Sequence, residues 1–339
     1  MAKPALWVRH LTPVEAPLAS AVLILLSVGA ALLLGSLLFL PFNAQPLAAY
    51  AAMLSQSFGS LTGIGFTLVR ATPLIFIGLG TIFAWRSGFF YLGFEGTLYI
   101  GGAMAVWVAL ATAADGALGP LPGLAFFPLV FIATFLADGA WAGIAGALRG
   151  RFGGNEVLIS LMMNYLAVLF INYLVSGPLR APGDLPQTPR IPDATILPFI
   201  LPDTRAHAGI IAALAGAFLV WLILRKTAIG YELIVAGLSP RAARYGGIDV
   251  GRRLLLAAVV AGGLGALAGL VEVLGVQYRL LDGISRGTGL SASWRRCWAA
   301  SNRWAWSSPR SCTRVWGWAP TPCSAARACR VPWSSSSKA

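Results

Sequence analysis

Long stretches of apolar residues recur along this chain, and short segments with polar and charged residues separate them. Each stretch is close to the roughly 20 residues that an α-helix needs to cross a hydrocarbon layer about 30 Å thick. The pattern therefore predicts an all-α protein, built as a polytopic bundle of transmembrane helices. Seven spans are expected, near residues 18–41, 60–84, 95–113, 124–147, 157–176, 207–224 and 254–276.

Composition and charge agree with a membrane protein and give it an orientation. Of the 339 residues, 57% are hydrophobic and only 11% are charged, which is unlike a soluble domain. Connections 42–59, 114–123 and 177–206 carry few or balanced charges, whereas the other connections are basic. The positive-inside rule then places the N-terminus in the cytoplasm and sends odd-numbered spans outward. The basic residues behind this assignment are Lys3, Arg9, Arg86, Arg149, Arg151 and the six lysines and arginines of 225–253.

The formal net charge of +13 raises the question of a nucleic-acid partner. Residues 291–339 hold eight of the 25 lysines and arginines and none of the 12 acidic residues, and they are rich in tryptophan. Such a tail suits stacking on bases and contacts with phosphate, but nothing before it resembles a nucleic-acid-binding fold. The remaining excess lies in cytoplasmic connections, where topology and anionic lipid explain it. We therefore expect membrane lipid, and no nucleic acid, among the partners.

Signatures of an enzyme are absent from the sequence. The two histidines, His10 and His207, are far apart, so neither a zinc site nor a histidine-based triad is expected. The four cysteines all lie after residue 296, at spacings that match no zinc pattern. No GxxxxGK[ST] phosphate loop occurs, so any ATP that drives this protein is bound by another subunit. We expect no catalytic residue, metal or cofactor.

Several polar side chains fall within the apolar spans or at their ends. A carboxylate at the bilayer centre costs several kcal/mol, so such groups normally face a bundle interior or a wet cavity. Each group alone is equally well explained by a hydrogen bond between packed helices or by a position at the interface. Taken together, they predict a polar path for a solute. Its residues are Glu95, Asn155, Glu156, Asn164 and Asn172, and Asp138 and Glu272 are further polar groups at this depth.

Two details refine this path. An α-helix turns 100° per residue, so Asn164 and Asn172 lie within about 80° of each other on one side of the fifth span. The glycines around Glu95 fit either a close helix approach or a broken, partly re-entrant segment. They are Gly93, Gly96, Gly101 and Gly102.

Three segments carry a resemblance to a known family. They are ATPLIFIGLGTIFAWRSGFFYLGFEG (71–96), GGNEVLISLMMNYLAVLFINYLVSGPLR (153–180) and AGLSPRAARYGGIDVGRRLLLAAVVAGGLGALAGLVEVLGV (236–276). In this order they resemble the membrane permease subunits of bacterial ABC importers, in the simple-sugar and nucleoside branch that works with basic-membrane-type lipoproteins. The resemblance implies a permease of the bacterial cytoplasmic (inner) membrane that performs no chemistry. Its implied partners are cytoplasmic ATP-binding subunits, a second homologous permease subunit and a solute-binding lipoprotein.

The predicted function is therefore uptake of nucleosides or simple sugars, as the permease of an ATP-driven importer. An ATP-independent secondary transporter or channel for a small polar solute stays open as the alternative. One departure from the family surrounds Glu95, because relatives often have Asn, Ala and Gln where this chain has Tyr91, Phe94 and Thr97. These residues would give the path a more apolar or aromatic face.

The segment GLSPRAARYGGI (237–248) resembles the family's cytoplasmic coupling segment, which docks on the ATP-binding subunit. The residues agree with this by themselves, because a proline can open a short helix and a Gly-Gly pair can stop it. An ordinary basic turn held by lipid headgroups explains the same residues. The expected coupling residues are Ser239, Pro240, Ala242, Ala243, Tyr245, Gly246 and Gly247, within a coupling loop at 225–253.

The end of the chain departs from the family more strongly. Relatives continue with further spans, whereas residues 285–339 are rich in Trp, Arg, Cys and Ser. Tryptophan has the single codon TGG, so a frame that starts at the third base of each codon turns Cys297–Ala299 into Leu-Gly. The same frame turns Trp316–Ala319 into Gly-(Leu, Met or Val)-Gly, which is typical of a membrane segment.

We therefore expect a shifted reading frame from near Ser285 to Gly287, and a chain that is defective in transport. An authentic Arg/Trp tail at the membrane interface is the alternative. The expected organisation is a cytoplasmic N-terminal segment (1–17), a permease domain (18–284) and the aberrant tail (285–339).

Overall fold

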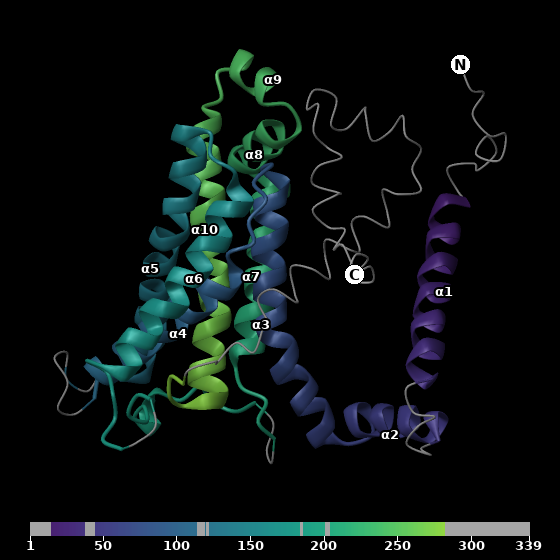
Figure 1. The fold of residues 1–339 in the computed structure, drawn as a ribbon, viewed down its shortest axis with the longest axis vertical. Coiled ribbons are helices and arrows are strands. Elements are labelled where there is room, and N and C mark those ends of the chain that lie inside the picture. Colours follow the sequence, from purple (N-terminus) through teal and green to yellow (C-terminus); the bar gives the residue numbers. More distant parts are fainter. Residues whose placement is uncertain are drawn as a thin grey trace, which may run out of the picture. The chain divides into compact units, whose positions relative to one another are not determined.

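The computed structural model describes residues 15–37, 45–113, 119, 122–183, 186–200 and 204–281. Most of these residues form α-helices (Figure 1), and the described part contains two isolated β-bridges but no β-strand. The prediction of an all-α protein is confirmed. Everything predicted for the 285–339 tail, and the N-terminal segment up to residue 14, lies outside the described residues.

Each of the seven predicted spans coincides with one helix, which confirms the polytopic bundle. In the described residues, six helices are long and apolar enough to cross a membrane. They are α3 (Leu61–Arg86), α4 (Phe94–Ala111), α5 (Gly123–Phe152), α6 (Glu156–Ser176), α7 (Gly209–Lys226) and α10 (Val250–Glu272), which a π-helical turn, η4 (Val273–Gln277), continues. The remaining helices are α1 (Glu15–Leu37), with the shorter apolar stretch Leu25–Ser36, α2 (Pro46–Phe58), α8 (Ala228–Leu238) and α9 (Pro240–Tyr245).

Helices α1 and α2 belong to a unit of their own. Pro46 occupies the first turn of α2, where the helix needs no N–H from it. The Tyr50 hydroxyl donates to the carbonyl of Leu32 over 2.8 Å and so ties α2 to α1. No residue of α2 is buried. Within this unit α2 is therefore a surface helix.

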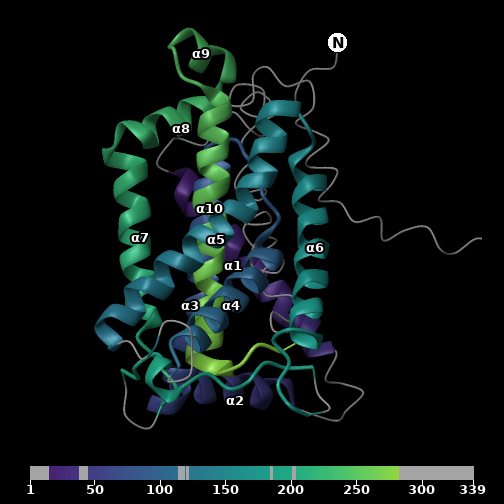
Figure 2. The same cartoon turned by 90° about the vertical axis from the view of Figure 1, so that its left-hand side faces the viewer.

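The described residues from Gly65 onward form a second unit, a bundle around α10. Figure 2 shows α10 crossing the middle of this bundle, between α7 and α6. α10 packs against α5 and α4. Glycines permit this approach: a Cβ on Gly262 would overlap Ala142, and a Cβ on Gly269 would overlap the backbone of Leu98. Small residues at the contact are how helices pack in lipid, where apolar side chains gain little by leaving hydrocarbon.

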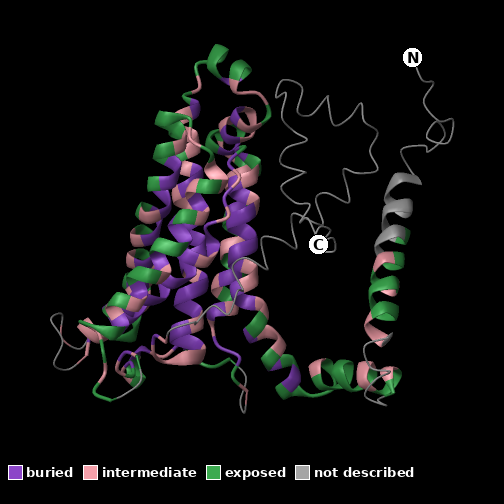
Figure 3. Cartoon of the chain, viewed as in Figure 1, coloured by how far each residue is buried: buried purple, intermediate pink, exposed green. Residues whose placement is uncertain are grey.

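Burial in this bundle follows the pattern of a membrane protein. Large apolar side chains such as Phe76, Phe83 and Leu98 are buried in its core. Figure 3 shows the buried residues gathered along the inner helices of the bundle. The outer faces of α6 and α7 are apolar too, and they leave side chains such as Leu169 and Phe218 exposed. Exposed apolar faces of this extent mark a surface that meets a membrane or another protein. The outside of the bundle thus suits lipid.

The bundle has two different ends. At the end named here the α9 end, α3, α5 and α7 finish and α6 and α10 begin. At the opposite end, residues 187–191 pair with residues 278–281, through backbone hydrogen bonds from Thr188 N to Leu280 O (3.1 Å) and from Ile191 N to Tyr278 O (3.0 Å). The α9 end gathers Arg86, Arg149, Arg151, Arg225, Lys226, Arg241, Arg244, Arg252 and Arg253.

Candidate translocation site and coupling segment

Helix α4 begins inside the bundle and not at one of its ends. α3 finishes at Arg86, and the residues that follow contact α8 at the α9 end. The chain then runs without helix through residues 87–93, the entry segment, and α4 starts at Phe94, beside Gly265 of α10. At 1.5 Å per residue, Gly265 lies about 22 Å along α10 from its start. The structure shows both alternatives for the glycines around Glu95. The segment is broken and partly re-entrant, and a Cβ on Gly101 would overlap the backbone of Ala266, so α4 and α10 also approach closely there.

Two side chains of α6 hold the entry segment. The Ser160 hydroxyl accepts a hydrogen bond from the N–H of Leu92 (3.2 Å), and the Asn164 amide group donates to the Leu92 carbonyl (3.0 Å). The Asn164 side-chain oxygen also accepts from the N–H of Gly96 (2.8 Å). Residues four apart lie one above the other on a helix, so Ser160 and Asn164 act from one face of α6. This pair is named the α6 clip.

The α6 clip supplies a hydrogen-bond acceptor that the residues at the start of α4 do not provide themselves. A helix leaves its first N–H groups without partners of its own, and a side chain at the N-cap position usually accepts from one of them. Gly93 occupies that position in α4 and offers no side chain. A Cβ there would overlap the ring of Tyr91. Asn164 accepts from Gly96, the third residue of α4, and therefore caps α4 from another helix.

Glu95 lies in the first turn of α4, and its side chain is partly exposed. A carboxylate is stabilised near a helix N-terminus by the helix dipole. Its neighbours Tyr91, Phe94 and Thr97 are fully buried, and the Tyr91 ring packs against Phe89 (5.7 Å) and Phe94 (5.1 Å between ring centroids). These three residues fill the core, so the aromatic ligand face expected from them does not form.

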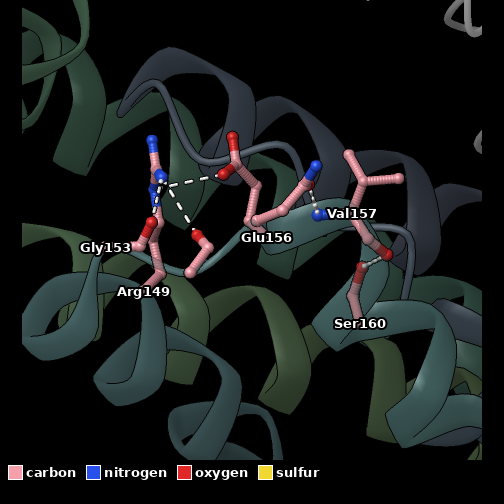
Figure 4. A network of polar contacts seen from close by, with 7 residues as sticks. Arg149, Gly153, Glu156, Val157 and Ser160 are labelled. Carbon is pink, nitrogen blue, oxygen red and sulfur yellow. Dashed lines mark hydrogen bonds and ion pairs between the residues drawn. The ribbon is translucent and has the colours of Figure 1, made fainter.

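Asn155 and Glu156 lie at the turn between α5 and α6. Figure 4 shows Glu156 and Arg149 joined across this turn. The Asn155 side chain accepts from the N–H of Val157 (3.0 Å) and caps α6. The Glu156 carboxylate pairs with Arg149 over 3.1 Å, from Nε to Oε2. The Arg149 guanidinium also donates to the carbonyls of the two glycines that follow α5. At this turn, Asn155 therefore satisfies one of the open N–H groups of α6, and Arg149 holds the two glycines that join α5 to α6.

The structure brings some of the predicted path residues together and separates others. Asn164 bonds the backbone next to Glu95, so these two lie at one place. Asn155 and Glu156 lie about two turns of α6 nearer to the α9 end, and Asn172 lies about two turns further away and is partly exposed. The sequence interpretation missed Ser160. Its spacing of four from Asn164 was the available signal.

Asp138 occupies the middle of α5 with a fully buried side chain. Among the described residues, neither of its carboxylate oxygens has a hydrogen-bond partner, and the same holds for Thr134 Oγ1 and Trp141 Nε1. Residues three and four apart share a helix face, so these groups lie on one side of α5. Glu272 differs, because it accepts from Gln277 (3.3 Å) at the opposite end. The described residues contain no group of three His, Cys, Asp or Glu side chains that could hold a metal.

The predicted coupling segment forms a short helix, α9, at the α9 end. The Ser239 hydroxyl accepts from the N–H of Ala242 (3.3 Å), and Pro240 is the first helical residue. Gly246 and Gly247 follow the last turn, and Gly247 has a φ of 76°, where glycine is favoured. The local signals read from the sequence thus predict both ends of this helix correctly.

The residues of α9 divide between an inner and an outer face. Ala243 is buried in a small core with Ala236 and Val250, separate from the main core. Tyr245 is 95% exposed and points away from the bundle. Beneath α9, Glu232 of α8 pairs with Arg253 of α10. The 225–253 loop is therefore mostly helical, and α9 projects from a packed base.

Comparisons with known proteins give the class of the molecule. The family described as branched-chain amino acid transport system / permease component matches residues 63–293. The chain belongs to this permease family. Guanosine ABC transporter permease protein NupP of Bacillus subtilis is 35% identical over 261 residues, which cover 75% of this chain and 72% of the relative. Glucose ABC transporter permease protein TsgB13 of Haloferax volcanii is 32% identical over 297 residues, with 84% and 73% covered.

A third relative is also a nucleoside permease. Nucleoside ABC transporter permease protein NupB of Lactococcus lactis is 29% identical over 259 residues, covering 74% of this chain and 70% of the relative. No solved structure matches the chain. The family confirms a transport subunit and not an enzyme. With the six apolar helices, it makes the chain a multi-pass protein of the cytoplasmic membrane that works with ATP-binding subunits and a solute-binding protein.

Proposed function

We propose that this permease belongs to an ATP-driven importer for nucleosides or simple sugars. The observation that carries the proposal is the start of α4 inside the bundle, with the Glu95 carboxylate on its first turn. Transporters of several folds place solute sites where a helix is interrupted in mid-membrane, because the open helix end offers polar groups there. The solute class is supported by the names of the relatives, a guanosine permease and a glucose permease.

The chemistry of these solutes suits a carboxylate. Nucleosides and sugars share adjacent hydroxyl groups, and an ionised carboxylate has two oxygens that only accept hydrogen bonds. We place Glu95 and Asn164 beside the middle of the solute path. Asn172 lies toward the opposite end of the path, and Asn155 and Glu156 lie toward the α9 end.

The orientation follows from charge. Basic residues gather at the α9 end, and the positive-inside rule assigns such an end to the cytoplasm. By the same rule, Lys3 and Arg9 before the first span support a cytoplasmic N-terminus. α9 then docks on the ATP-binding subunit, with the exposed Tyr245 in the contact. The other proposed coupling residues are Ser239, Pro240, Ala242, Ala243, Gly246 and Gly247. The further proposed partners are a second homologous permease subunit and lipid around the bundle, and a solute-binding lipoprotein at the opposite end.

Thiol labelling tests the orientation and the docking together. The four native cysteines are first replaced by serine, and then Tyr245→Cys and Phe199→Cys are made separately, because both side chains are exposed and they lie at opposite ends. A membrane-impermeant maleimide should label position 199 in intact cells, and position 245 only after permeabilisation. Position 245 should also crosslink to the ATP-binding subunit. The reverse labelling would overturn the orientation, and a failure to crosslink in an assembled complex would overturn the docking.

We further propose that the 285–339 tail is the product of a shifted reading frame. In the gene, reading from the third base after about codon 286 should yield an open frame of apolar residues and glycines, whereas early stop codons would make the tail authentic. Uptake of guanosine should be measured in cells that produce the frame-restored chain. There, Glu95→Leu should slow the entry of guanosine. Uptake that persists after ATP depletion would favour the secondary transporter or channel.

A further inference from the structure

The polar atoms of the α6 clip are all committed to backbone groups. Asn164 uses its oxygen for the N–H of Gly96 and its nitrogen for the carbonyl of Leu92. The Ser160 hydroxyl accepts from Leu92 and donates to the carbonyl of Val157 (3.1 Å). Ser160 is 0% and Asn164 only 7% exposed. Side chains that are buried and bonded in this way orient the backbone groups that they bind.

We propose that Ser160 and Asn164 are positioning residues that hold the entry segment and the start of α4, and so keep Glu95 aimed at the solute path. The inference rests on the proposed path past Glu95, and it gives the α6 clip a role other than contact with the solute. As in any α-helix, the N–H groups before the first helix bond, from Thr97 N to Gly93 O (3.1 Å), have no partner within α4. The clip supplies a partner for one of them, the N–H of Gly96.

Burial increases the effect that loss of these hydrogen bonds would have on the start of α4. A buried backbone group that loses its partner is destabilising, because no water replaces the partner. The clip serves three backbone groups at once, the buried N–H of Gly96 and the part-buried N–H and carbonyl of Leu92. Gly93 can offer no replacement, because a side chain there would overlap Tyr91. Releasing the clip should therefore loosen the whole start of α4.

The clip also connects Glu95 to the α9 end. Ser160 and Asn164 lie one and two turns after Glu156, whose pairing with Arg149 fixes the start of α6. A helix transmits a displacement along its axis, so a shift of the α5–α6 turn moves the clip and with it the start of α4. The position of Glu95 is thereby linked to the side on which the ATP-binding subunit is proposed to dock.

Residue-resolved hydrogen exchange on the purified full-length chain tests the clip. Ser160→Ala should speed exchange at the amide of Leu92, and Asn164→Leu at the amide of Gly96, each about tenfold, as expected for the loss of a bond that contributes about 1.4 kcal/mol. Asn164→Asp keeps an oxygen acceptor and should restore protection at Gly96. Asn172→Leu, on the same side of α6, is the matched control and should change neither amide. If Asn164→Leu does not fold, two results still test the clip. Ser160→Ala should speed exchange at Leu92, and Asn164→Asp should leave Gly96 protected.

Labelling of Glu95→Cys, in the chain without native cysteines, separates the clip from the path. A water-soluble maleimide should label position 95, at a rate that Asn164→Leu changes several-fold and Asn164→Asp brings back. If position 95 is never labelled, the proposed path is wrong whatever the exchange data show. If position 95 is labelled but exchange at Leu92 and Gly96 and the labelling rate are the same in every variant, the positioning role is wrong. Equal acceleration of exchange throughout the bundle would also overturn it, because it would indicate general loss of packing.

Discussion

The helices that begin at the α9 end and the helix that begins inside the bundle start in different ways. At the α9 end, α6, α8, α9 and α10 each have a capping side chain of their own, from Asn155, Thr227, Ser239 and Asp249. α4 has Gly93 at the same position and receives its cap from Asn164, 71 residues further along the chain. The helix starts at the α9 end are thus specified by their neighbours in sequence, whereas the buried start of α4 is specified by a tertiary contact.

The surroundings of a helix start explain why the loss of its cap has a different effect at the α9 end than inside the bundle. An N–H at an exposed helix end can bind water when its cap is lost, so a local cap contributes only about 1 kcal/mol. Inside a bundle in lipid, water is not at hand, and every backbone polar group must be satisfied by protein. The comparison therefore predicts a large effect at the start of α4 and smaller effects at the α9 end.

The largest effect is expected when a local cap is forced on α4. In Gly93→Ser the new Cβ overlaps the Tyr91 ring, and overpacking of this kind costs about 1–3 kcal/mol. At about 2–4 °C per kcal/mol, the melting temperature should fall by several degrees. Gly246→Ser is the matched control, because its Cβ would lie 3.5 Å or more from any neighbour, and it should melt like the parent. Equal melting of both variants would show that Tyr91 can move and that α4 could be capped locally.

A smaller effect is expected for the cap of α9. Ser239→Ala removes the acceptor for the N–H of Ala242, which should cost about 1 kcal/mol and fray α9 alone. Hydrogen exchange should quicken at Ala242 and stay unchanged at Gly96. Ser239→Asp provides another good cap and should behave like the parent. A change at Gly96 in Ser239→Ala would break the comparison, because it would show that the two kinds of helix start are not independent.

The same contrast explains how much could be predicted from sequence. The spans were predictable because a long apolar run has few alternatives, and α9 was predictable because Pro240 and Gly246–Gly247 are local signals. The α6 clip was not, because its bonds join residues 68 and 72 positions apart. The inward direction of Tyr91 and Phe94 also depends on packing with distant helices. Glu95 and Asn164 could be singled out as polar residues in the membrane, but their relation could not.

A still smaller effect is expected at the α5–α6 turn. The Arg149–Glu156 pair is partly exposed, at 37% and 18% of the two side chains, and such pairs contribute up to about 1 kcal/mol. Arg149→Met also removes bonds to two carbonyls at the end of α5. The control is Arg252→Met, which breaks an ion pair with Asp249 exposed at 86% and 56% and should leave the melting temperature unchanged. An equal response of the two variants would contradict a special role for the turn.

The smallest effect concerns His207, directly before the uncapped start of α7 at Ala208. The His207 side chain is 1% exposed, a Cβ on Gly275 would lie against its ring, and neither ring nitrogen has a hydrogen-bond partner among the described residues. Burial lowers the pKa of His207 below its usual 6.5, and a hydrogen bond of its own backbone opposes this only in part. The folded protein therefore binds the proton less well than the unfolded chain does.

The sign of the pH dependence follows from this lowered pKa. Above about pH 6.5 both states are neutral and His207 does not disfavour folding. As the pH falls from 6.5 toward the folded-state pKa, the unfolded chain takes up the proton first, so stability declines, and below the folded-state pKa the loss stays constant. The melting temperature of the parent should thus drop more between pH 8 and pH 5 than that of His207→Gln, which cannot titrate. Parallel melting curves for the two proteins over this range would show that His207 gains a partner or water when charged, and that this end of α7 tolerates charge as the α9 end does.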